Sequence, residues 1–285
     1  MYKFFQKISV LSIALSMFVV SAQAQIQTPQ ASPAATISQS IGLGKATVEY
    51  SRPALKGRKM FGAQVPYGKV WRTGANKITN LVLSEEMMVN GQKVPAGAYG
   101  LFTIPTATDW TIILSKDANM WGAYEYKQAN DVLRFTVKSE KLAKKQEHFT
   151  IEFTDFTPSE ASVAISWENT LVKFPIKNDA DARIMADIEK KMSATEISPA
   201  TYSAAANYYY DTNRDLNKAY EWASKVVEKD QKFWTYYLRG KIAAKIGKCD
   251  VAVSDATKGL AMAKEAGDDS YIMNHQKVLS ECKGK

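Results

Sequence analysis

A basic and aromatic segment is the part of this chain whose residue types are best suited to bind a ligand. No acidic residue lies between Glu49 and Glu85, while cationic and aromatic side chains recur through that interval. Positive charges attract an anion, and aromatic rings offer flat faces for stacking. The segment therefore predicts a surface for an anionic or saccharide ligand. Its basic and aromatic members are Tyr50, Arg52, Lys56, Arg58, Lys59, Phe61, Tyr67, Lys69, Trp71, Arg72 and Lys77.

Five side chains of this segment form the candidate ligand-binding site. Arg72 is a planar donor fork that can grip a carboxylate or sulfate with two hydrogen bonds, and Trp71 offers a large flat face. Thr73 and Asn76 supply uncharged hydrogen bonds. Arg52, in an extended Ser-Arg-Pro context, can join them from a neighbouring strand.

A structural alternative stays open for the same residues. In it, Arg72 pairs with an acid such as Glu49, and Trp71 belongs to the core. The aromatic run Trp121–Tyr126 has the same two interpretations. It is a sugar-stacking platform if it is exposed and ordinary core if it is buried.

Groups able to catalyse a reaction are scarce. The only histidines are His148 and His275, which the patterns place at a strand end and on a surface helix. A histidine-rich metal site and the paired-cysteine zinc signatures are absent from the sequence. The glycine-rich stretches Gly42-Leu43-Gly44 and Gly97-Ala98-Tyr99-Gly100 do not continue as a phosphate-binding loop. We therefore expect no catalytic residue, no metal and no cofactor. An enzyme alternative remains, a carboxylate-based glycan hydrolase, which needs two facing acids about 5–10 Å apart.

The first residues have the pattern of a secretory signal peptide. Lys3 and Lys7 precede an apolar run over Ile8–Val20, and Ala22-Gln23-Ala24 resembles a small-residue cleavage site. The run is shorter than the roughly 20 residues of a membrane-spanning helix. We expect a signal peptide over residues 1–24, cleavage near Ala24–Gln25, and a periplasmic or secreted protein without a transmembrane segment. Residues 25–36 then form a flexible leader.

The excess positive charge belongs to the N-terminal half. Residues 25–178 hold 18 basic and 13 acidic residues, whereas residues 179–285 hold 17 and 16. Nucleic acid is not an expected partner of an exported protein, so the charge favours an anionic or saccharide ligand.

Two hydrophobic periodicities divide the chain. Residues 37–178 alternate with period two, and Asn90-Gly91 between two short runs is typical of a hairpin. Eight or nine short strands predict an antiparallel β-sandwich or a partly open barrel. Over residues 179–285 the period becomes 3.6, which predicts helices and an α+β protein of two domains. Ser198 before Pro199 and Asp215 are expected caps of two helices. The other helices are expected to begin at Asp181, Phe233, Asp250 and about Ser270.

The motifs of the β region resemble a known family. Tyr50-Ser51-Arg52-Pro53 and Val65-Pro66-Tyr67-Gly68-Lys69-Val70-Trp71-Arg72-Thr73-Gly74-Ala75-Asn76 are similar to the family named domain of unknown function 2911. The resemblance covers about residues 35–178. It implies a fold and a cellular location, and it does not imply a reaction.

The helical region resembles tetratricopeptide repeats. Ala219 and Ala223 recur as Ala252 and Ala256, a shift of 33 residues, and Gly240 lies where a tight helix pair needs a small residue. Such repeats imply binding of a protein or peptide. Two cysteines in an oxidising compartment, Cys249 and Cys282, are a disulfide candidate, with two buried thiols as the alternative.

Together these patterns predict an envelope protein that binds a ligand or partner, or acts as a scaffold, without catalysing a reaction. A third possibility gives the β domain a purely structural role and leaves protein binding to the helices.

Overall fold

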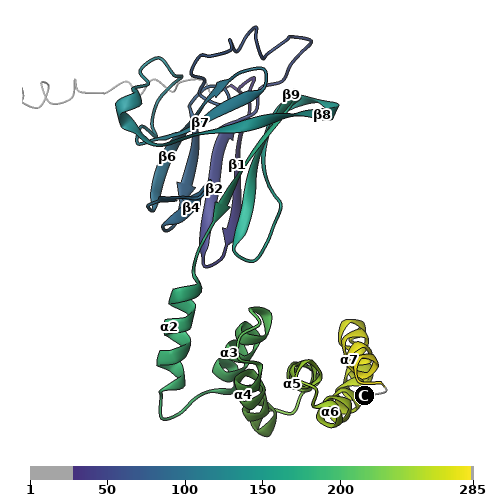
Figure 1. The fold of residues 1–285 in the computed structure, drawn as a ribbon. Helices are drawn as coiled ribbons and strands as arrows, with labels where there is room; N and C mark the ends of the chain where they lie inside the picture. Colours follow the sequence, from purple (N-terminus) through teal and green to yellow (C-terminus); the bar gives the residue numbers. More distant parts are fainter. Residues whose placement is uncertain (1–27, 284–285) are drawn as a thin grey trace, which may run out of the picture. The chain divides into compact units, whose positions relative to one another are not determined.

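The computed structural model describes residues 28–283, and the chain divides into two compact units at Asp179 and Ala180 (Figure 1). The first unit is an antiparallel β domain and the second is helical, so the predicted α+β class is confirmed. The predicted signal peptide lies outside the described residues.

A single antiparallel sheet of nine strands forms the first unit, in the order β1-β2-β3-β6-β7-β8-β9-β4-β5. β1 and β5 each pair on one side only, so the sheet is open. β1 begins at Ala34, so the last residues of the predicted leader belong to the sheet. The strands are β1 (Ala34–Ile41), β2 (Gly44–Ser51), β3 (Thr79–Leu83), β4 (Met87–Val89), β5 (Gln92–Val94), β6 (Gly97–Pro105), β7 (Asp109–Ser115), β8 (Asp131–Thr154) and β9 (Glu160–Lys177).

β8 and β9 depart from the predicted pattern of short strands, since they span 24 and 18 residues. β8 pairs with β7 over its first part and with β9 over its second, so one strand serves both halves of the sheet. The two halves face each other across one core. Tyr50 of β2 packs on Phe149 of β8 with ring centroids 5.9 Å apart, and its hydroxyl donates to the Ile151 carbonyl.

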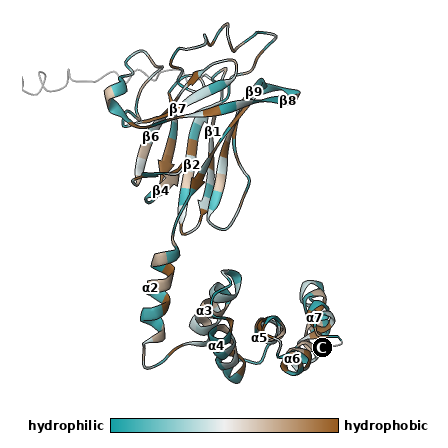
Figure 2. Ribbon diagram, in the orientation of Figure 1, coloured by the Kyte–Doolittle hydropathy of each residue, from teal (hydrophilic) through white to brown (hydrophobic). Residues whose placement is uncertain are grey.

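The alternating pattern explains which side of each strand is buried. Along β2, buried residues such as Ala46 and Val48 alternate with the more exposed Lys45, Thr47 and Glu49. Figure 2 shows this alternation as changes of colour along the strands. One face of each strand thus contributes to the core and the other remains outside.

The predicted hairpin is present between β4 and β5. Asn90 and Gly91 have φ angles of 48° and 78°, the positive values that a two-residue hairpin turn requires at both positions. The pairing of Val89 with Gln92 closes the turn.

Helices make up the second unit, and each begins close to a predicted start. Ser198 and Asp215 cap two of them, since their side chains accept hydrogen bonds from backbone N–H groups of the first turn. Gly267 ends another helix at φ 70°. The helices are α2 (Asp181–Met192), α3 (Pro199–Asp211), α4 (Leu216–Lys229), α5 (Phe233–Lys245), α6 (Cys249–Ala266) and α7 (Asp269–Glu281).

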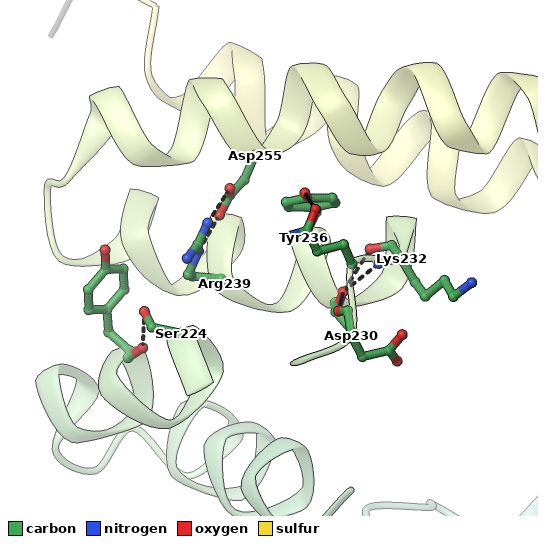
Figure 3. Close-up of polar contacts among 9 residues, drawn as sticks. Ser224, Asp230, Lys232, Tyr236, Arg239 and Asp255 are labelled. Atoms are coloured by element: carbon green, nitrogen blue, oxygen red, sulfur yellow. Dashed lines mark hydrogen bonds and ion pairs between the residues drawn. The ribbon is translucent and has the colours of Figure 1, made fainter. Parts of the chain in front are cut away.

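From α3 to α7 consecutive helices pack as neighbours, and α5 also contacts both α3 and α7. The contact between α5 and α6 contains an ion pair: Arg239 Nε and Asp255 Oδ2 lie 2.7 Å apart, and Asp255 is buried (Figure 3). At the start of α6, Cys249 forms a disulfide with Cys282, with Cα atoms 5.4 Å apart. The bond ties the start of α6 to the end of α7.

Candidate functional site

Trp71 lies in an aromatic core cluster. Only 9% of the residue is exposed, and its ring stacks on Trp167 with centroids 6.0 Å apart. Phe149 and Phe61 meet the same ring edge-on at 5.3 and 5.9 Å. The structural alternative therefore describes Trp71 better than the stacking-platform interpretation does.

Three more candidate residues hold the polypeptide in place. Thr73 is fully buried with φ 56°, and its hydroxyl lies 3.1 Å from that of Thr103. The Asn76 side chain donates to the side chain of Gln30. Arg52 donates from its guanidinium to the hydroxyl of Thr150. Each of these polar groups already has a protein partner, so the structure does not gather all five candidates into one site.

Arg72 differs from the other four. No acid of the described residues lies within ion-pair distance of it, so the pairing with an acid such as Glu49, which the structural alternative named, is not formed. Its Nε atom is buried and makes no hydrogen bond. Leaving a guanidinium nitrogen unsatisfied is costly, because the lost hydration is not replaced. An anion bound to the terminal nitrogens would not reach the buried Nε, but it would balance the charge of the guanidinium.

The guanidinium lines a groove of about 240 Å³. Lys69 adds a second positive charge, and the described lining contains no carboxylate, so an anion would meet no like charge there. The lining residues are Gln64, Val65, Pro66, Lys69, Val70, Trp71, Arg72, Ala123 and Tyr124. We call this the Arg72 groove.

The exposed aromatic residues beside the groove belong to the segment 116–127. The Ile78 N–H donates to the Met120 carbonyl, and the ring of Tyr126 packs on Phe102 at 5.1 Å. These anchors leave Trp121 64% and Tyr124 90% exposed. Tyr126 is thus half-buried against the core, whereas Trp121 and Tyr124 have the exposure that the platform interpretation requires.

The anchor residue Tyr126 is also tied by charged groups. Its hydroxyl donates to the carboxylate of Asp131 at 2.8 Å and accepts from Arg134 at 2.6 Å. Burial, followed by the hydrogen bond to Asp131, raises the pKa of Tyr126 to about 12. The phenol therefore stays protonated at neutral pH, and its hydrogen bonds hold the C-terminal end of the segment 116–127 in place.

A larger groove of about 550 Å³ lies beside the β4–β5 hairpin. Its lining mixes acids with lysines, and Glu86 and Lys93 pair at 3.2 Å. This groove therefore holds charges of both signs, whereas the described lining of the Arg72 groove holds cations alone.

The two histidines lie in different environments. His148 is exposed, as expected, but the expectation that His275 is a surface residue is wrong, since it is 0% exposed. Its Nε2 lies 3.0 Å from the Phe233 carbonyl, and its Nδ1 has no partner. Burial lowers the pKa of His275. Tyr271, His275 and Val278 follow helical spacing, and that stripe was the available signal for burial.

Sequence reasoning also missed Lys241 on α5. This half-buried ammonium donates to the side-chain oxygen of Asn207 at 3.0 Å and lies 4.4 Å from the ring centroid of Tyr210. Tyr237 approaches from another side at 5.5 Å. Burial lowers the pKa of Lys241. No carboxylate pairs with it in the described part of the chain.

The described residues contain no group of three or more histidine, cysteine or acidic side chains placed to hold a metal ion. A search of residues 28–283 for long apolar helices found none able to cross a membrane.

Comparison with known proteins gives a family and no activity. Neither the curated proteins nor the solved structures provide a match. The model of one family, described as "Protein of unknown function (DUF2911)", matches residues 32–176, which is just over half of the chain and nearly the whole β domain. The chain therefore belongs to this family of unknown function.

Proposed function

We propose that this protein is a non-enzymatic binding module of the bacterial envelope, whose β domain binds an anionic or saccharide ligand. The observation that carries the proposal is the guanidinium of Arg72, which has no ion pair among residues 28–283 and lines a groove whose described lining contains no acid. Tyr124 and Lys69 beside it add an exposed ring and a second cation. Export, with cleavage near Ala24–Gln25, is part of the proposal and is supported by the sequence pattern alone.

Arg72→Gln tests the proposal. A thermal-shift screen would compare the wild-type chain from Gln25 with this variant, against acidic oligosaccharides, peptidoglycan fragments and simple carboxylates. A ligand at about 100 times its dissociation constant stabilises by about 2.7 kcal/mol. We expect an acidic ligand to raise the melting temperature of the wild type and not that of Arg72→Gln.

Lys93→Gln serves as the control, because it removes an exposed positive charge away from the groove. If Lys93→Gln abolishes the shift as fully as Arg72→Gln does, the effect is one of net charge and the proposed site is wrong. A wild-type protein that no acidic ligand stabilises also contradicts the proposal.

The glycan-hydrolase alternative finds less support. The described lining of the Arg72 groove has no carboxylate. Two acids of the β domain already have protein partners: Asp155 pairs with Lys173 at 3.2 Å, and Glu168 accepts the N–H of Phe61 at 2.9 Å. Two facing acids beside the exposed aromatic residues would be needed for hydrolysis.

A second function is favoured by Lys241. We propose that the helices, as a tetratricopeptide-like unit, bind a protein or peptide through the face where α3, α5 and α7 meet. The ammonium of Lys241 is partly desolvated, and its hydrogen-bond and ring partners among the described residues are neutral. Asp211 acts on it without forming an ion pair, so a carboxylate of a peptide would supply a direct ionic partner.

Peptides with a free or an amidated C-terminus test this second function. We expect free-acid peptides to bind the wild type more tightly than amidated ones, and Lys241→Met to remove the preference. Lys245→Met, an exposed lysine of the same helix, is the control. Equal binding of the two peptide forms by the wild type would contradict the role of Lys241.

A further inference from the structure

A row of polar side chains crosses the outer face of the sheet. Strand register pairs Thr36 of β1 with Glu49 of β2, and Glu49 with Asn80 of β3. Directly paired residues of antiparallel strands project from the same face. The row therefore places a hydroxyl, a carboxylate and an amide side by side across three strands. The sequence patterns did not predict that these three residues form a group.

This row lines a groove of about 330 Å³, which we call the Glu49 groove. Trp121 and Lys77 line it too, and their backbones are joined by a β-bridge. The bridge fixes the chain behind Trp121, while the indole remains 64% exposed. The segment that carries the indole is thus already held beside a polar surface before a ligand binds, so binding costs little conformational entropy there.

Several polar side chains of the Glu49 groove can form further hydrogen bonds. Glu49 and Lys77 form no ion pair, and neither their side chains nor that of Thr36 make a hydrogen bond within the described residues. The groove therefore offers acceptors and a donor beside an apolar ring face. A sugar ring matches this set, because its hydroxyl groups both donate and accept while its C–H face packs on an indole.

The segment 121–124 connects the two grooves. Trp121 lines the Glu49 groove, and Ala123 and Tyr124 line the Arg72 groove. A ligand that runs along this segment would meet an uncompensated cation on one side and a mixed polar surface with an indole on the other.

We propose that the Glu49 groove is a subsite for an uncharged sugar ring, and that the β domain binds an oligosaccharide whose acidic group lies on Arg72. The inference rests on the proposed function and deepens it, since it names the ligand class and a second set of binding residues: Thr36, Glu49, Lys77 and Trp121.

A glycan array with paired probes tests the proposal. Each acidic oligosaccharide, such as oligogalacturonate, is spotted beside its methyl ester, which keeps the rings and removes the charge. The wild-type protein is compared with Trp121→Ala, Glu49→Ala and Arg72→Gln. Trp234→Ala is the matched control, because Trp234 is a 44% exposed tryptophan of the helical unit. Melting curves verify that each variant is folded.

We expect Trp121→Ala to weaken binding of both probe forms by at least about tenfold, as removal of an aromatic anchor does. Glu49→Ala should weaken both forms as well. Arg72→Gln should lose the preference for the acidic form and keep the binding of the ester. Trp234→Ala should bind as the wild type does.

Two results would overturn the inference, and they differ in what else they remove. If Trp121→Ala and Glu49→Ala bind as the wild type while Arg72→Gln fails, the sugar subsite is wrong and the anion-binding function survives. If the wild type retains no saccharide of the array but simple carboxylates stabilise it through Arg72, the ligand class is wrong. If neither kind of ligand binds, the proposed function fails too.

Discussion

Arg239 and Arg72 carry the same guanidinium group in opposite surroundings. Arg239 donates from two nitrogens to the carboxylate of the buried Asp255, each at 2.7 Å. Arg72 has a buried Nε without any acceptor. The Arg239–Asp255 pair thus neutralises both charges inside the helical unit. The guanidinium of Arg72 instead remains able to bind an anion in its groove. Residue type alone does not separate these two roles.

Asp255→Ala should be strongly destabilising, because it would leave the charge of Arg239 without its partner next to the core. We expect a loss of about 3–5 kcal/mol in the free energy of unfolding, measured by denaturant unfolding followed by circular dichroism. Asp187→Ala is the control: its pair with Lys191 is exposed, so about 1 kcal/mol or less is expected. Similar losses for both variants would show that the Arg239–Asp255 pair is not a buried, stabilising contact.

Burial of His275 predicts a dependence of stability on pH. Because its folded pKa lies below its unfolded value, the unfolded chain binds a proton first as the pH falls. The free energy of unfolding should therefore be retained above about pH 6.5 and should decrease below it, by at most about 1.4 kcal/mol per pH unit.

Two variants isolate this effect, since His148 and His275 are the only histidines. Unfolding would be measured between pH 5 and pH 8. His148→Gln should keep the pH dependence, because His148 is exposed, and His275→Gln should flatten it. A dependence that follows His148 would contradict the assignment.

Among the elements, α5 and α6 show how helix packing uses small residues. Gly259 of α6 lies against the ring of His275, where an added Cβ would come within 2.1 Å of Cε1. Gly240 of α5 faces Asp255, where the nearest atom would be 3.5 Å away, an ordinary contact. A side chain larger than hydrogen therefore fits at Gly240 but not at Gly259, although both glycines lie inside helices.

The two glycines make a matched prediction. Gly240→Ala should leave stability unchanged or raise it by up to about 1 kcal/mol, because alanine favours the helix. Gly259→Ala should destabilise by about 1–3 kcal/mol despite the same propensity gain, because the ring must move within a filled core. Thermal unfolding of the two variants measures this. A stabilised Gly259→Ala protein would show that His275 does not occupy the position described.

At the scale of the whole molecule, the chain has two units with different cores. The β unit relies on contacts between distant strands, such as those of Tyr50 with Phe149 and of Trp71 with Trp167. The helical unit uses contacts between consecutive helices and a disulfide that spans 33 residues of sequence.

Removal of the disulfide should affect one unit only. Replacing Cys249 and Cys282 by serine should lower the stability of the helical unit by about 2–4 kcal/mol, because the unfolded chain regains the freedom of that loop. The helical transition, followed at 222 nm, should move to lower temperature. The transition of the β unit should stay in place when it is followed by tryptophan fluorescence in a background where Trp222 and Trp234 of the helical unit are replaced by phenylalanine. A shift of both transitions would contradict this independence.

The sequence by itself determined the local features of this protein. Periods of two and 3.6 predicted the sheet and the helices, Asn90-Gly91 predicted the hairpin, and Ser198 and Asp215 marked helix starts, because each signal acts between residues close in the chain. Family motifs over the β domain agree with the match to residues 32–176.

Only the tertiary structure decided which side chains of the basic segment remain free. Trp71 is buried because strands distant in sequence bring Phe149 and Trp167 to its ring, whereas Arg72, the next residue, points to a groove without acids. Similarly, His275 is buried because α6 provides a glycine opposite it. Such pairings depend on strand register and helix packing, and these are set by the summed contacts of the whole core and not by any short motif.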